Sequence, residues 1–131
     1  MVCLPFIERM DLAYALADVV LARSGASTVA ELTACGLPSI LVPYPHAAAD
    51  EQTANAAALT GAGAAVLVPD AELDAGRLLE VATPMLSNPR TASDMGAAAR
   101  ALGRPDAASA VARVILDAAG LHPRQAGEEQ G

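Results

Sequence analysis

Aromatic side chains and positive charge are both scarce in this chain of 131 residues. Aromatic residues make up 2% of the sequence, tryptophan is absent, and the formal net charge is −7. The scarcity of aromatic residues argues against a platform on which the bases of single-stranded nucleic acid could stack. The negative charge disfavours nucleic acids and anionic lipids, because both carry negative charge themselves. We therefore expect no nucleic-acid partner.

The sequence also has little that is typical of metal sites, membrane spans or redox cofactors. Its two cysteines, Cys3 and Cys35, have no metal-type spacing, and we interpret them as reduced thiols of a cytoplasmic protein. No apolar run approaches the ~20 residues of a membrane span, and no secretory signal opens the sequence. No group of residues is typical of a nucleophilic triad, and the three-glycine dinucleotide fingerprint is absent. We therefore expect no metal ion and no cofactor.

What the sequence does contain is an alternation of short apolar runs and helical patterns. The apolar runs are typical of buried strands, which we predict at 19–23, 39–42 and 64–68, with a weaker fragment at 2–4. The helical patterns predict helices at 11–17, 27–35, 50–60, 73–86, 89–102 and 105–120. Strands that alternate with helices form βαβ units. The predicted fold class is therefore α/β, a partial Rossmann-like, doubly wound parallel sheet followed by C-terminal helices.

The predicted sheet is smaller than that of a complete nucleotide-binding domain of this type, which usually has about five or six strands. We therefore interpret residues 1–120 as the later part of such a domain, incomplete at its N-terminal side. The polar, glycine-containing residues 121–131 are predicted to form a disordered tail. The exposed edge of an incomplete sheet favours self-association of the chain.

The most informative stretch is R-S-G-A-S-T-V-A-E at 23–31, where a predicted strand leads into a helix. The first N–H groups of a helix have no partner inside it and carry partial positive charge, so a phosphate can bind there. Glu31 lies about one turn further on, and helical side chains lean back toward the start of their helix. Its carboxylate can accept hydrogen bonds from the two neighbouring hydroxyls of a ribose. Together these features predict a nucleotide site at the carboxyl end of the sheet.

The same stretch also has plain structural interpretations, which the sequence leaves open. Thr28 and Glu31 fit a capping box, and Ser27 or Thr28 alone can cap the helix without any ligand. Arg23 can neutralise a phosphate or pair with an acidic residue such as Asp18.

A second polar segment follows the strand predicted at 39–42 and therefore falls at the same edge of the sheet. His46 can orient a diphosphate or a sugar, although a loop histidine bonded to backbone is the simpler interpretation. Asp50 and Glu51 favour the positive end of a helix, since adjacent helical residues do not face each other. Gln52 and Asn55 fall three apart, and hence on one helix face, which on its own is typical of a solvated polar surface.

Several motifs occur together in this chain, namely F-I-E-R-M at 6–10, A-D at 17–18, the 23–31 stretch, G-L-P at 36–38, V-P-Y-P-H at 42–46 and Q-T-A-N-A at 52–56. Their order and spacing resemble those of the MurG family, in glycosyltransferase family 28. These enzymes transfer N-acetylglucosamine from its uridine diphosphate (UDP) ester to a lipid-linked muramyl-pentapeptide in peptidoglycan synthesis. Their two Rossmann-like domains form the arrangement called GT-B. This chain resembles, over residues 2–120, only the later part of the C-terminal, donor-binding domain.

The resemblance implies roles for matching residues in binding UDP-N-acetylglucosamine. The expected donor-binding residues are Ile7, Ala26, Ser27, Thr28, Val29, Ala30, Glu31 and Gln52, with Ser24, Gly25, His46, Glu51 and Asn55 as further candidates. Ile7 is expected to meet the uracil through its backbone, and the 26–28 turn to present the helix tip to the diphosphate. Glu31 is expected to hold the ribose hydroxyls and Gln52 those of the sugar, while Asn55 braces the loop. Glu51 stands where some family members carry a glutamine.

The resemblance further implies an inverting hexosyltransferase that converts lipid I to lipid II. Such an enzyme is peripheral on the inner, cytoplasmic face of the bacterial plasma membrane. The acceptor site and the candidate catalytic base belong to the family's N-terminal domain, so no catalytic residue is expected here and the chain alone is expected to be inactive. Two alternatives stay open, namely a donor-binding subunit of a split glycosyltransferase and a non-catalytic nucleotide-binding fragment.

Overall fold

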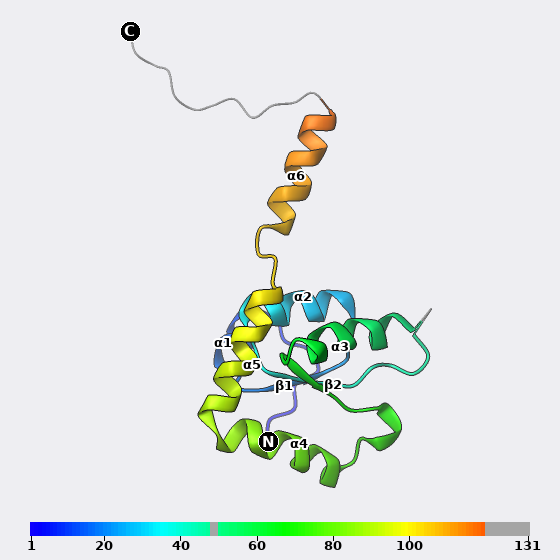
Figure 1. The fold of residues 1–131 in the computed structure, drawn as a ribbon, viewed down its shortest axis with the longest axis vertical. Coiled ribbons are helices and arrows are strands. Elements are labelled where there is room, and N and C mark those ends of the chain that lie inside the picture. The colour runs from blue at the N-terminus through cyan, green and yellow to red at the C-terminus, as the bar shows by residue number, and fades with distance from the viewer. Residues whose placement is uncertain (48–49, 120–131) are drawn as a thin grey trace.

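A computed structural model describes residues 1–47 and 50–119 of the chain (Figure 1). In chain order the elements are α1 (Met10–Leu16), β1 (Val20–Ala22), α2 (Ala26–Cys35), β2 (Ser39–Leu41), α3 (Glu51–Gly61), β3 (Ala65–Leu67), the 3-10 helix η2 (Asp70–Glu72), α4 (Ala75–Ser87), α5 (Pro89–Leu102) and α6 (Ala107–Ala118). Within the described residues, no helix is long and apolar enough to cross a membrane.

The three strands form one parallel sheet in the order β1-β2-β3. Ile40 of β2 is in register with Leu21 of β1 and Val66 of β3. All three residues of β2 are buried, because this strand has a neighbour on each side and helices over both faces. The predicted α/β class with a parallel sheet is therefore confirmed.

Two core clusters lie on opposite faces of the sheet, as the alternation of side chains along a strand requires. On one face, Leu41 packs with Leu32 of α2 and Leu59 of α3. On the other, Ile40 packs with Met85 of α4. Figure 1 shows α2 and α3 together on one side of the sheet and α4 on the other. Helices on both faces make the sheet doubly wound.

The boundaries of several helices follow from local sequence signals. Asn88 caps α5 by accepting a hydrogen bond from the N–H of Arg90 at 3.0 Å, and Pro89 takes the first helical position, so the helix predicted at 89–102 begins where expected. At the other end of α2, Gly36 adopts φ 65°, a left-handed conformation that glycine reaches without strain and that ends the helix.

The strand fragment predicted at 2–4 is wrong, since this segment has no regular structure. Val2 and Leu4 are 83% and 63% exposed. A strand needs a hydrogen-bonded neighbour, and in the described part of the chain the sheet ends at β1. The helix predicted at 105–120 begins at Ala107, and α6 extends away from the other elements (Figure 1). The tail predicted at 121–131 lies outside the described residues.

Candidate functional site

The start of α2 is open and has no side-chain cap. Gly25 occupies the N-cap position with extended backbone, φ −63° and ψ 152°, and the helix follows directly. Ser27 and Thr28 lie inside the first turn, so the prediction that either of them caps the helix is wrong. The first intrahelical bond runs from the N–H of Val29 to the Gly25 carbonyl at 3.0 Å. The N–H groups before it are left to point out of the helix, where the helix dipole adds partial positive charge.

Ser24 and Asn55 fasten this turn to α3. The hydroxyl of Ser24 donates to the carbonyl of Gln52 at 2.7 Å, and the side-chain amide of Asn55 donates to the carbonyl of Ser24 at 3.1 Å. Ser24 is completely buried. We call this pair of hydrogen bonds the turn–helix clasp. It holds the tip of α2 against the first turns of α3.

Glu31 is exposed on α2, and its carboxylate is held by a residue that the sequence did not single out. Oε2 of Glu31 accepts a hydrogen bond from the hydroxyl of Tyr14 on α1 at 2.7 Å. Burial, followed by the bond to Glu31, raises the pKa of Tyr14 to about 12. The pair borders a hollow of about 290 Å³ between the two helices, which we call the α1–α2 crevice. Its lining residues are Met10, Asp11, Tyr14, Glu31, Ala34 and Cys35.

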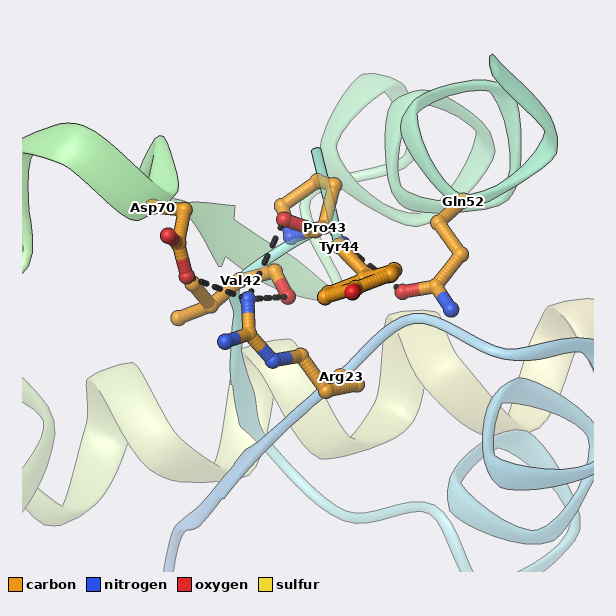
Figure 2. A network of polar contacts seen from close by, with 6 residues as sticks. All are labelled: Arg23, Val42, Pro43, Tyr44, Gln52 and Asp70. Carbon is orange, nitrogen blue, oxygen red and sulfur yellow. Dashed lines mark hydrogen bonds and ion pairs between the residues drawn. The ribbon is translucent and has the colours of Figure 1, made fainter. Parts of the chain in front are cut away.

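Gln52 is also fixed by a contact with the neighbouring loop. Its Oε1 accepts a hydrogen bond from the backbone N–H of Tyr44 at 2.9 Å, as Figure 2 shows. Among the residues the structure describes, its Nε2 has no partner. An amide nitrogen donates only, so Nε2 of Gln52 offers hydrogen-bond donors to a ligand.

Arg23 ties the carboxyl ends of the strands together (Figure 2). Its Nη1 lies 2.5 Å from Oδ1 of Asp70 and 3.3 Å from the carbonyls of both Val42 and Pro43. The guanidinium also lies 5.6 Å from the centre of the Tyr44 ring. Arg23 therefore pairs with an acidic residue, one of the two interpretations that the sequence left open, but the partner is Asp70 from the segment after β3 rather than Asp18. Arg23 supports the loop that holds Gln52.

The other candidate residues lie around these contacts. His46 packs edge-on against the Tyr44 ring with 5.6 Å between centroids. Glu51 is exposed in the first turn of α3. Ile7 is 40% exposed on the segment just before α1. No group of three histidine, cysteine or acidic residues that could hold a metal ion occurs within residues 1–47 and 50–119.

A second hollow, of about 330 Å³, lies on the other side of α2. It is lined by Ala26, Val29, Ala30, Thr33, Asn55, Leu102, Arg104 and Ala107. Both hollows therefore border α2, and only the second includes a residue of its tip, Ala26. Arg104 is a cation here that the sequence did not single out, because it comes from the segment after α5.

Comparison with known proteins identifies the class to which this fold and site belong. The family described as the glycosyltransferase family 28 C-terminal domain matches residues 1–111, and the chain belongs to this family. The resemblance to the MurG family found in the motifs is confirmed.

Individual relatives agree with this assignment. The chain is 47% identical over 120 residues to the UDP-N-acetylglucosamine–N-acetylmuramyl-(pentapeptide) pyrophosphoryl-undecaprenol N-acetylglucosamine transferase of Rhodococcus jostii, covering 92% of this chain and 31% of that protein. It is 51% identical over 115 residues to the protein of the same name from Alkalilimnicola ehrlichii, covering 88% and 32%. The crystal structure of MurG from Acinetobacter baumannii superimposes with a TM-score of 0.79 at 37% identity, covering 87% of this chain and 34% of that one. The chain thus spans about a third of the length of these relatives.

Proposed function

We propose that this chain binds UDP-N-acetylglucosamine as the donor-binding part of an N-acetylglucosamine transferase. The observation that carries the proposal is the uncapped tip of α2 with the exposed carboxylate of Glu31 on the same helix. An anion at such a tip is stabilised by about 0.3–1 kcal/mol, and by up to about 2 kcal/mol where it is partly buried. The names of the relatives supply the identity of the donor.

Each part of the donor has a matching feature of the chain. The diphosphate binds the N–H groups at the tip of α2, and the ribose hydroxyls donate to Glu31 at the α1–α2 crevice. The uracil then lies toward the start of α1, close to the backbone of Ile7. The sugar accepts hydrogen bonds from Nε2 of Gln52, on the side of the α2 tip opposite the ribose.

The reaction proposed for the whole enzyme is a direct displacement with inversion. The acceptor hydroxyl forms a bond to the anomeric carbon, the bond from that carbon to the diphosphate oxygen breaks, and UDP leaves with the electron pair. The tip of α2 stabilises the negative charge that develops on the diphosphate. The base that takes the acceptor proton, and the acceptor site, belong to the rest of the enzyme, so the chain alone is expected to bind the donor without transferring it. A lipid-linked acceptor puts the whole enzyme at the inner face of the plasma membrane.

Calorimetric titration with UDP and with UDP-N-acetylglucosamine tests the proposal. Glu31→Ala is expected to weaken both by about ten- to a hundred-fold, because a hydrogen bond to a charged group contributes about 1.5–3 kcal/mol. Glu80→Ala is the matched control, since Glu80 is an exposed helical carboxylate on α4 that pairs with Arg77. A folded wild-type chain that binds neither nucleotide, or a Glu31→Ala variant that binds like wild type, contradicts the proposal.

We also propose that the free edge of β1 allows self-association of the isolated chain. In the described residues β1 pairs with β2 alone, and Leu21 in its middle is 44% exposed. Light scattering of the wild-type chain is expected to give a mass above that of one copy. Leu21→Lys is expected to lower that mass, because a charge on an edge strand opposes pairing. A monomeric wild-type chain contradicts this part of the proposal.

A further inference from the structure

Tyr14 joins the hydrophobic core to the candidate ribose site. Its ring is half-buried and packs against the core cluster that contains Leu32 of α2. Its hydroxyl reaches the border of the α1–α2 crevice and donates to Oε2 of Glu31 at 2.7 Å. The ring is therefore fixed by packing, and the hydroxyl has a defined position relative to α2.

We propose that Tyr14 is a positioning residue for ribose recognition, holding Oε2 of Glu31 so that Oε1 is presented to the ribose hydroxyls. The inference rests on the proposed function, in which Glu31 binds the ribose. An exposed glutamate is free to adopt several rotamers, and binding a ligand must select one of them at an entropic cost. A hydrogen bond from a rigid donor makes that selection before the ligand arrives.

The other crevice residues do not offer this support. Asp11 is engaged with Arg9, whose guanidinium donates to both of its carboxylate oxygens at 2.9 and 2.6 Å. Cys35 is only a weak hydrogen-bond donor, and the remaining lining residues, Met10 and Ala34, have no donor in their side chains. The pKa of Tyr14, about 12, lies far above the neutral range, so its hydroxyl is protonated there and able to donate.

The test compares the affinity of the complete 131-residue chain for UDP with its affinity for 2′-deoxy-UDP, by calorimetry. The ratio of the two affinities measures ribose recognition and is expected to favour UDP in the wild type. Tyr14→Phe keeps the ring and removes only the hydroxyl. We expect it to lower the ratio by about three- to ten-fold, through the loss of one charge-assisted hydrogen bond.

Two further variants separate positioning from a merely structural role. In a Glu31→Ala background, Tyr14→Phe is expected to change the ratio by less than about twofold, because Tyr14 acts through Glu31. Thr83→Val removes an exposed hydroxyl that donates to the Leu79 carbonyl on α4, and it is expected to leave the ratio unchanged.

The outcomes distinguish this inference from the proposed function. Suppose that Glu31→Ala removes the preference for UDP over 2′-deoxy-UDP, as the proposed function requires. If Tyr14→Phe then weakens the binding of both nucleotides equally, or of neither, the positioning role of Tyr14 is overturned while the proposed function stands. If Glu31→Ala leaves the ratio unchanged, or if the wild-type chain binds neither nucleotide, the proposed function fails and the inference fails with it.

Discussion

We predict that the turn–helix clasp, the two hydrogen bonds between Ser24 and α3, contributes measurably to the stability of the chain by holding the α2 tip in place. Ser24→Ala removes the hydroxyl that donates to the Gln52 carbonyl, while the Asn55 bond to the Ser24 backbone carbonyl remains possible. A hydrogen bond of this kind contributes about 0.5–1.5 kcal/mol, and a buried group left without a partner adds to the loss. Because Ser24 is completely buried, we expect a destabilisation of about 1–2 kcal/mol.

Thermal unfolding followed by circular dichroism measures this loss. An unfolding entropy of about 2.1 cal/mol/K per residue corresponds to about 0.28 kcal/mol/K for the 131-residue chain. The expected decrease in Tm is therefore about 4–7 °C. Asn55→Ala is expected to act on the same clasp, so the double variant should lose less than the two single losses combined.

Thr83→Val is the matched control, because it also removes a hydroxyl bonded to a backbone carbonyl, but at an exposed position. Its stability is expected to stay within about 0.5 kcal/mol of wild type. If Ser24→Ala melts at the wild-type temperature, or if the two clasp variants are fully additive, the reasoning that makes the clasp a cooperative support of the α2 tip is refuted.

Three more predictions concern packing, pH and charge. Gly96→Ala is expected to destabilise the chain by about 1–2 kcal/mol in urea unfolding, since the new Cβ would lie 2.7 Å from the Gly36 carbonyl oxygen. This overpacking outweighs the better helix propensity of alanine. An unchanged unfolding midpoint would show that α5 can shift away from Gly36 without cost. The raised pKa of Tyr14 predicts a contribution to stability that is complete below pH ~10 and is lost as pH rises through about 12, and this step should be missing from Tyr14→Phe. Asp70→Asn is expected to cost at most about 1 kcal/mol, because Asp70 and Arg23 are both substantially solvent-exposed; a larger loss in the same assay would mean that this pair holds the strand ends more strongly than an exposed ion pair can.

The order of elements was largely predictable from the sequence, because its signals are local. Apolar runs of strand length marked β1, β2 and β3, and glycine and proline marked the ends of α2 and the start of α5. The position of the α2 tip followed from the same signals. The strand fragment at 2–4 was wrong because a short apolar run becomes a strand only beside another strand.

The contacts within the candidate site were not predictable in this way. Thr28 and Glu31 have the spacing of a capping box, yet the chain enters α2 at Gly25 and Glu31 binds Tyr14 instead. Arg23 had an acidic residue near it in the sequence, yet it pairs with Asp70, 47 positions away. Sequence spacing describes neighbours along one element, whereas these partners come from different elements.

The sequence by itself determined which segments become strands and helices, where the tip of α2 forms, and to which family the motifs belong. Only the tertiary structure decided what holds the site, by packing α1 against α2 and bringing the ends of three strands together. Hydrophobic periodicity and capping act over a few residues, while the partners of Glu31, Arg23 and Ser24 lie 17, 47 and 28 positions away. Residues so far apart in the sequence come into contact only when the sheet and its helices have packed.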